Sequence, residues 1–259
     1  MAKVSVITIV KNHAIGLVAT HQSLLEQSFS DWEMVIVFGV SGDATLAVAK
    51  DMQSNDSRIL LIEQSDSGIY EAMNEGLTSA SGEFIWFMNA GDRFASTSTL
   101  ASAVVHISQN NEGAIIGGYR MEGSSQNKAY SYPSRNINSL SFAFNRRGGC
   151  HQAMIFRTKF LKELGGFDTS YSLAADFDLV LRVIQNYKAS RNSEIYASIE
   201  PGGRADQGIF LVHNQKHQIR KNLLNGPILV LASFLWTALA KIKIILKRII
   251  KCLVRPKRQ

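Results

Sequence analysis

The sequence predicts an α/β fold in which a mainly parallel sheet carries helices on both faces. Short apolar runs rich in β-branched and aromatic residues alternate with segments of helical periodicity in the first half of the chain. The connections between these segments are short, which favours parallel strands joined by helices. With 46% apolar and 19% charged residues among 259, the chain can bury a large core, and its composition excludes a mostly disordered protein.

The predicted elements of the first half follow one another in strict alternation. The expected strands, each apolar on both faces, are 4–10, 33–38, 59–62 and 83–88. The expected helices between them are 15–27, 46–52 and 70–80. Gly82 follows the last of these helices at the place where a left-handed C-cap would end it.

The second half of the chain is less regular than the first. We expect strands over 114–119 and 153–156 and a helix over 173–186. The pattern predicts one domain over residues 1–210, divided into halves 1–112 and 113–210. A helical tail over 211–259 follows it.

The basic residues of this chain are concentrated near its C-terminal end. The formal net charge is +7, and eleven of the 28 Lys and Arg residues but none of the 21 Asp and Glu residues lie within 215–259. A nucleic-acid-binding enzyme would more often spread its basic residues around an aromatic-lined cleft. We therefore expect no nucleic-acid partner.

Cysteine content and the N-terminal segment indicate where the protein resides. The two cysteines, Cys150 and Cys252, lie about 100 residues apart, which excludes a disulfide scaffold and suits a reducing compartment. The first apolar run is too short for the core of a signal peptide. We therefore expect a cytoplasmic protein.

The tail combines an apolar stretch with a basic one. Residues 227–240 carry no charge, and these fourteen residues fall short of the roughly 17–25 that span a bilayer. From Lys241 on, Lys and Arg recur at helical spacing opposite a face of Ile and Leu. This pattern predicts a basic amphipathic helix suited to an anionic membrane surface. The alternative is a helix that packs on the protein's own core.

Polar residues follow three of the expected strands, at the edge of a parallel sheet where ligands bind. They are Lys11-Asn12, the turn 39–43 and the run Asn89–Asp92. Asp92 comes soon after a fully apolar strand, and such a carboxylate is a ligand that hard divalent cations prefer. The alternative for Asp92 is a turn residue or helix cap before the Ser/Thr-rich run that follows.

Four motifs in this order resemble the family 2 glycosyltransferases, which have the GT-A fold. They are Ser67-Gly-Ile-Tyr-Glu-Ala-Met-Asn74, Ala80-Ser-Gly-Glu83, Asn89-Ala-Gly-Asp92, and Gly165-Gly-Phe-Asp168 followed by Ala175-Asp176-Phe-Asp178-Leu179 and Arg182. The sequence from Asp66 to Asn74 and the pair His151-Gln152 resemble the sequences of the branch that includes colanic-acid and O-antigen enzymes. The resemblance covers residues 4–208, about four fifths of the chain.

The resemblance implies an inverting, metal-dependent enzyme that moves a sugar from a nucleotide-sugar donor to a saccharide acceptor. The acceptor would be carried on a membrane polyprenyl diphosphate, in lipopolysaccharide or other surface polysaccharide synthesis at the inner face of the bacterial plasma membrane. Residues 1–112 would then be the nucleotide-sugar-binding half, 113–210 the acceptor half and 211–259 a membrane-associating tail.

Two carboxylates receive roles from the same resemblance. Asp92 would hold Mg²⁺ or Mn²⁺ against the donor diphosphate, because a cation offsets the charge that develops on the leaving group. Asp176 would be the catalytic base, since a sugar hydroxyl is a poor nucleophile until a carboxylate takes its proton. The alternative for Asp176 is a first-turn residue favoured by the helix dipole.

The resemblance also implies a set of residues that contact the substrates. These candidate substrate-binding residues are Val10, Asn12, Asp43, Asp66, Asn74, Asn89, His151, Gln152 and Arg204. For His151 the alternative is a structural hydrogen-bonding role, and for Arg204, which could clamp phosphate, it is a solvated loop charge.

Three positions depart from the family pattern. Phe38 stands where relatives carry an Asp that reads the nucleobase, so the base is stacked, or read differently, or contacted by Asp43 or Asp66. Gly91 stands where many relatives have another Asp, and Ala175 replaces an acidic residue. Two rival functions follow: a nucleotidyltransferase of the same fold, which would not need Asp176, and a non-catalytic nucleotide-sugar-binding homologue.

Overall fold

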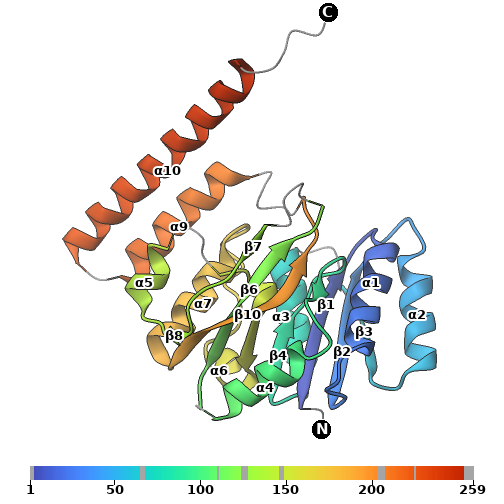
Figure 1. The fold of residues 1–259 in the computed structure, drawn as a ribbon. Helices are drawn as coiled ribbons and strands as arrows, with labels where there is room; N and C mark the ends of the chain where they lie inside the picture. Colours follow the sequence, from blue (N-terminus) through green and yellow to red (C-terminus); the bar gives the residue numbers. More distant parts are fainter. Residues whose placement is uncertain are drawn as a thin grey trace, which may run out of the picture.

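The computed structural model describes residues 3–64, 68–109, 111–123, 128–145, 149–202, 208–224 and 226–253, with side chains up to residue 246. Figure 1 shows a central sheet flanked by helices, with a long C-terminal helix that projects from this body. The predicted alternation of the first half is confirmed, and element ends differ from the predicted ones by a few residues. These elements are β1 (Val4–Val10), α1 (Ala14–Leu25), β2 (Trp32–Gly39), α2 (Thr45–Asn55), β3 (Ile59–Gln64), α3 (Ile69–Ser79) and β4 (Phe84–Phe87).

The sheet is mixed, but most of its strands point in one direction. Its strand order is β3-β2-β1-β4-β9-β6-β10-β5, with β5 (Arg93–Phe94), β6 (Ala114–Met121), β9 (Met154–Arg157) and β10 (Ala189–Ile199). Strands β3, β2, β1 and β4 pair in parallel, and so do β6 and β10. Strand β9 is antiparallel to both β4 and β6, so these two share a direction. The mainly parallel sheet is therefore confirmed.

Several elements of the second half were not predicted from the sequence. Ala153, the expected start of a strand, belongs to the 3₁₀ turn η1 (His151–Ala153). The other unpredicted elements of this half are β7 (Ala129–Tyr130), β8 (Arg135–Asn136), α5 (Ser139–Ala143), α6 (Thr158–Glu163) and β10. In the first half, β5 and α4 (Thr99–Gln109) were not predicted either. Helix α9 (Ile209–Leu223) lies almost wholly within the predicted helical tail. The predicted helix 173–186 is α7 (Ala175–Asn186).

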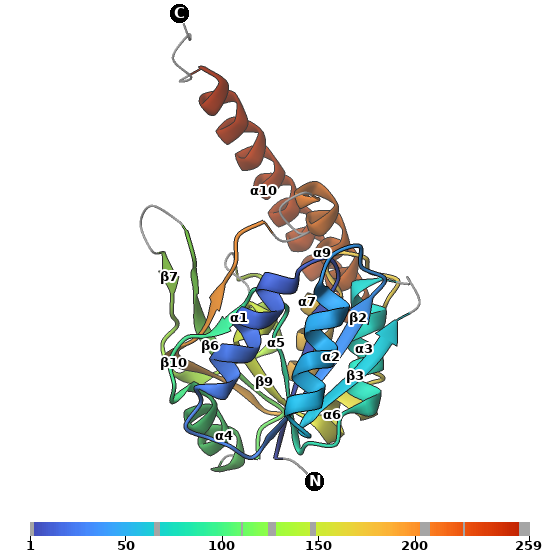
Figure 2. The ribbon, with the colours of Figure 1, turned by 90° about the vertical axis from the view of Figure 1, so that its right-hand side faces the viewer.

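Helices cover both faces of the sheet, as the sequence predicts (Figure 2). Along β1, Val4 and Val6 pack with residues of α1, α2 and α4, whereas Ile7 packs with α3, α6 and α7 on the opposite face. Two buried clusters result, one on each side. They hold the strands so that their C-terminal ends form a common edge.

Gly82 does not adopt the left-handed conformation that the sequence analysis expected. Helix α3 ends in an extended residue, Ala80, at φ −68° and ψ 133°, and Gly82 has no positive φ. Its small size is required by close packing instead: a Cβ on Gly82 would lie 2.6 Å from the backbone nitrogen of Ser5. The Gly82 N–H donates to Ser5 Oγ at 2.8 Å, so the two backbones cannot separate without losing this bond.

The C-terminal helices α9 and α10 (Pro227–Leu253) lie side by side, and α10 extends beyond the body (Figures 1 and 2). Ile219 of α9 and Leu224 are buried in the same cluster as α7, so this core continues across the boundary predicted at residue 210. The apolar and basic stretches of the predicted tail form one continuous helix. Within it, Pro227–Leu246 is long and apolar enough to cross a membrane, with a mean hydropathy of 2.0.

Substituting Gly82 by Ala should destabilise the fold because the new Cβ meets backbone that cannot move away. Overpacking of this kind costs about 1–3 kcal/mol, which urea denaturation monitored by circular dichroism would detect. Gly42→Ala is the matched control, since its nearest neighbouring atom lies 4.0 Å away. Equal unfolding free energies for the two variants would contradict the packing role.

Candidate active site

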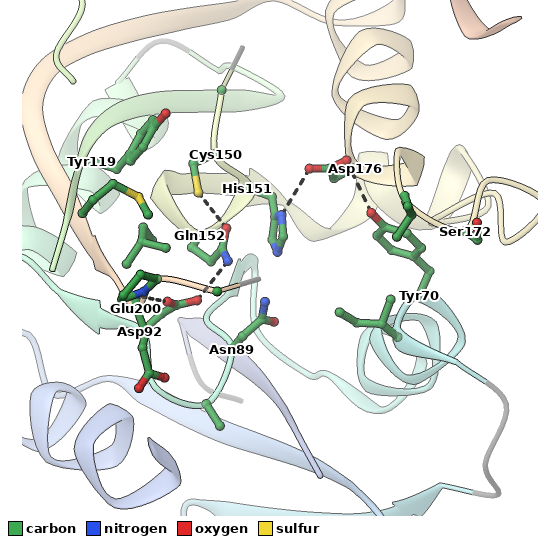
Figure 3. Close-up of a pocket in the computed structure, with 18 residues that line it drawn as sticks. Tyr70, Asn89, Asp92, Tyr119, Cys150, His151, Gln152, Ser172, Asp176 and Glu200 are labelled. Atoms are coloured by element: carbon green, nitrogen blue, oxygen red, sulfur yellow. Dashed lines mark hydrogen bonds and ion pairs between the residues drawn. The ribbon is translucent and has the colours of Figure 1, made fainter. Parts of the chain in front are cut away.

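Two adjoining pockets lie at the C-terminal edge of the parallel strands. The first, of about 460 Å³, contains both predicted carboxylates, Asp92 and Asp176 (Figure 3). The second, of about 810 Å³, is lined by the ends of β1 and β2 and the start of α3. Asn89 and Ala90 line both pockets, so a ligand that occupies the two together would pass over these residues.

Asp92 is held rigidly in the wall of the first pocket. Only 5% of it is exposed, and its carboxylate accepts hydrogen bonds from Gln152 Nε2 and the Glu200 backbone N–H, each at 2.9 Å. The thiol of Cys150 donates to Gln152 Oε1 at 2.7 Å, and this bond fixes the orientation of the Gln152 side-chain amide. Burial raises the pKa of Asp92 to about 6, and these two hydrogen bonds oppose that rise.

Asp176 occupies the first turn of α7 on the other side of the same pocket. His151 Nδ1 lies 3.4 Å from one carboxylate oxygen, and the Phe177 N–H donates to the other at 2.8 Å. The hydroxyl of Tyr70 lies 3.4 Å from that second oxygen. Burial alone would raise the pKa of Asp176, but His151, then Lys216, then the Phe177 N–H outweigh it and lower the pKa.

Two buried polar atoms in this pocket have no hydrogen-bond partner among the described residues: Asn89 Oδ1 and His151 Nε2. An ionised carboxylate only accepts, so the His151 Nδ1 that faces Asp176 carries a proton. Together with the Asp92 carboxylate, the Asn89 oxygen is the kind of ligand that hard divalent cations take. The residues therefore fit a cation that would draw its remaining ligands from a diphosphate and water.

This fit rests on few protein ligands. Within the described ranges, no group of three or more His, Cys, Asp or Glu side chains gathers in a geometry for a metal ion. A cation shared with substrate phosphates needs only one or two carboxylates, so the small donor set is consistent with such a site.

Of the predicted donor-side residues, Val10 and Asn12 line the second pocket and Asp43 lines neither pocket. The Asp43 carboxylate accepts hydrogen bonds from the N–H groups of Thr45 at 3.0 Å and Ala14 at 3.2 Å, the first residues of α2 and α1. Hydrogen bonds from Thr45 lower its pKa. The structure therefore gives Asp43 the role of a helix cap.

Asn74 is also engaged in structural hydrogen bonds. Its amide nitrogen donates to the Phe167 carbonyl at 2.9 Å, and its amide oxygen accepts from the Phe167 N–H at 2.8 Å. Arg182 donates to the carbonyl of Gly166 at 2.7 Å. These bonds fix the turn that contains Gly166, whose φ is 70°. Asn74 lines neither of the two pockets.

The remaining sequence-predicted residues divide into two groups. Asn89, His151 and Gln152 line the first pocket, as expected for a site. Asp66 and Arg204 lie outside the described residues.

Phe38 is buried in the core on the face that α1 and α2 cover. Phe38 lines neither pocket, whereas Gly39 at the end of β2 lines the second.

Sequence reasoning missed three residues of this site: Tyr70, Glu200 and Lys216. Glu200 directly follows β10, a strand that the sequence did not predict. Lys216 belongs to the stretch predicted as tail, yet its ammonium lies 4.9 Å from the ring centroid of Phe177, the residue after Asp176.

Comparisons with known proteins agree with this geometry. The sequence model of "Glycosyl transferase family 2" matches residues 5–165. The chain is 29% identical to a PGL/p-HBAD biosynthesis glycosyltransferase of Mycobacterium bovis (strain BCG / Pasteur 1173P2) over 183 residues, 70% of each chain. It is 30% identical over 118 residues to the uncharacterized glycosyltransferase EpsJ of Bacillus subtilis (strain 168), covering 46% of this chain and 34% of EpsJ.

Solved structures share the fold at low sequence identity. TarS 1-349 of S. aureus, in complex with UDP-GlcNAc, has a TM-score of 0.70 at 19% identity, over 88% of this chain and 70% of TarS 1-349. The mannosyltransferase PcManGT of Pyrobaculum calidifontis, in complex with GDP-Man and Mn²⁺, has a TM-score of 0.68 at 19% identity, over 92% of this chain and 70% of PcManGT. The expected GT-A fold is thereby confirmed. With the family match over most of the body, the chain belongs to glycosyl transferase family 2 and is a glycosyltransferase.

Proposed function

We propose that this glycosyltransferase is an inverting, divalent-cation-dependent enzyme that transfers a sugar from a nucleotide-sugar donor to a saccharide acceptor. The observation that carries the proposal is the pairing of Asp92 and Asp176 in one pocket, in environments that shift their pKa values in opposite directions. Such separation of two titratable groups is how one site assigns different tasks to two carboxylates.

The donor would bind across both pockets, with its nucleoside in the second and its diphosphate over Asn89 and Ala90. The nucleotide-sugar complexes of TarS and PcManGT support this donor class. Asp92 and Asn89 would hold Mg²⁺ or Mn²⁺, which when bound stabilises the charge of the departing diphosphate. Backbone and small side chains at the ends of β1 and β2 would face the nucleoside.

Asp176 would act as the general base. Its lowered pKa keeps it ionised near neutral pH, and His151 holds the carboxylate so that it faces the pocket. As the acceptor hydroxyl forms its bond to the anomeric carbon, its proton passes to Asp176 while the bond from that carbon to the diphosphate breaks on the opposite side. One base suffices, no enzymic nucleophile is needed, and the product is inverted.

Asp176→Asn should abolish most transfer while leaving donor binding near wild type, since an amide keeps the size but cannot take the proton. Loss of a general base costs about 10²–10⁴-fold in rate. Release of free nucleoside diphosphate measures the rate, and release of pyrophosphate instead would indicate a nucleotidyltransferase. Asp168→Asn, an exposed carboxylate outside both pockets, is the control. More than a tenth of wild-type activity in Asp176→Asn would remove it from this role.

Asp92→Asn should weaken nucleoside diphosphate binding only when a divalent cation is present, because the interaction it loses runs through the ion. Isothermal titration of UDP and of GDP, each with Mn²⁺ and with EDTA, measures this difference. Affinity in EDTA should match that of wild type. Equal losses with and without EDTA would mean that Asp92 serves the fold alone.

Helix α10 would hold the enzyme at the inner face of the plasma membrane, where a polyprenyl-linked acceptor lies. One side of α10 packs on α9 through the buried Ser233 and Thr237, and the other side exposes a row of large apolar residues. This row consists of Ile228, Leu231, Phe234, Leu235, Leu239, Ile242, Ile245 and Leu246. Lys243 is exposed as well, which suits an anionic lipid surface.

The double substitution Phe234→Glu/Leu235→Glu should release the protein from vesicles that contain anionic lipid. Burying each of these side chains contributes about 1.5–3 kcal/mol, so binding should fall about a hundredfold or more. Flotation measures it, and salt should weaken wild-type binding without abolishing it, because apolar insertion is not screened. Val18→Glu/Val105→Glu, similarly exposed on α1 and α4, is the control. A wild-type chain that stays unbound would overturn the membrane proposal.

A further inference from the structure

Gly91 leaves a space beside Asp92 that a carboxylate from another element fills. Gly91 has φ 100°, and a Cβ built on it would lie 2.0 Å from Glu200 Oε2. No side chain at position 91 can therefore coexist with Glu200 as it is placed. The carboxylate of Glu200, which follows β10, therefore occupies the space beside Gly91.

Glu200 is tied to both sides of this space. Its backbone N–H donates to the Asp92 carboxylate at 2.9 Å, and its side-chain oxygen Oε2 lies 2.8 Å from His13 Nε2. His13 precedes α1 and lines the second pocket, whereas Glu200 lines the first. Figure 3 shows Glu200 and Asp92 next to each other in the pocket wall, near Asn89. The contact between Glu200 and His13 thus links a residue of the first pocket to a residue of the second.

From this geometry we infer that Glu200 supplies the second carboxylate of the cation and diphosphate site, in the place that Gly91 leaves open. The inference rests on the proposed metal-dependent function. It assigns Glu200 the role of a cation ligand, directly or through water, and His13 the role of a positioning residue.

Charge supports this assignment. The Asp92 carboxylate is almost wholly buried, and Glu200, whose backbone N–H donates to it, lines the same pocket. Two neighbouring carboxylates of this kind repel each other, and a divalent cation between them would remove that repulsion. The unpartnered amide oxygen of Asn89 lies in the same wall and offers a third oxygen. The half-exposed Glu200 side chain leaves room for phosphate and water.

The test measures Mn²⁺ binding by the full-length protein, with electron paramagnetic resonance of free Mn²⁺, alone and with UDP or GDP. Loss of a residue that orients a metal ligand costs 10–100-fold in affinity, so Glu200→Gln should weaken Mn²⁺ binding by at least about tenfold. Asp92→Asn should do the same. Glu122→Gln, whose partner is Arg93 at 3.5 Å, is the matched control and should bind as wild type does.

The outcomes separate this inference from the function on which it rests. If Asp92→Asn loses Mn²⁺ and Glu200→Gln does not, Glu200 only bridges β10 to His13, and the inference fails while the proposed function stands. If neither substitution changes Mn²⁺ affinity, both fail. In EDTA, Glu200→Gln should melt within about 2 °C of wild type, since its side chain is half exposed. A melting point more than about 5 °C lower would make its role structural and contradict the inference.

Discussion

The buried carboxylate of Asp92 is the constraint on which the arrangement of the site depends. A carboxylate with 5% exposure is costly to bury unless donors surround it, and its donors come from η1 and from the end of β10. Thr20 of α1 donates to the Asp92 carbonyl at 2.7 Å and accepts from the Gly91 N–H at 3.0 Å. The turn after β4 therefore fixes α1, η1 and β10 relative to one another, and both pockets form between the elements that it joins.

The two carboxylates differ because their surroundings differ, although both lie in one pocket. Asp92 is enclosed by neutral donors and approached by a second acid, so the free carboxylate is held at an electrostatic cost that a cation would relieve. Asp176 faces His151 and Lys216, and these groups stabilise its charge. The first environment suits a ligand for a cation, and the second suits a base that stays ionised until a hydroxyl approaches.

The sequence predicted the first half of the fold well because its strands are continuous apolar runs. Strand β1 was predicted with its observed ends. Strand β10 was missed because its first half is polar: Arg191 and Asn192 are buried there at 5% and 4% exposure, with no apolar pattern to mark them. Only tertiary pairing with β6 and β8 makes this segment a central strand.

In the candidate site too, some residues could be predicted from the sequence and others could not. Asp92 and Asp176 were predicted because motif order places them at the ends of predictable elements, and the structure brings both into one pocket. Asp43 and Asn74 were assigned to substrate because a polar residue near a pocket cannot be told from a cap or a turn clamp until its backbone partners are known. Glu200 was not predicted because strand β10, which precedes it, was not predicted. Its proposed role depends on the space beside Gly91, and only the folded chain defines that space.

Helix α9 joins the helix proposed to bind the membrane to the residue proposed as the base. On one side, Gln215 Oε1 accepts the Leu173 N–H at 3.0 Å, just before α7 begins, and Lys216 adds to the charge that stabilises Asp176. On the other side, His217 lies 2.8 Å from Ser233 Oγ of α10. Arg220, buried between these contacts, donates to the Ala143 carbonyl at 2.8 Å and anchors α9 to the body. The orientation of α10 is therefore fixed relative to the first pocket, and a membrane that binds the exposed side of α10 would meet the acceptor half of the enzyme at a defined angle.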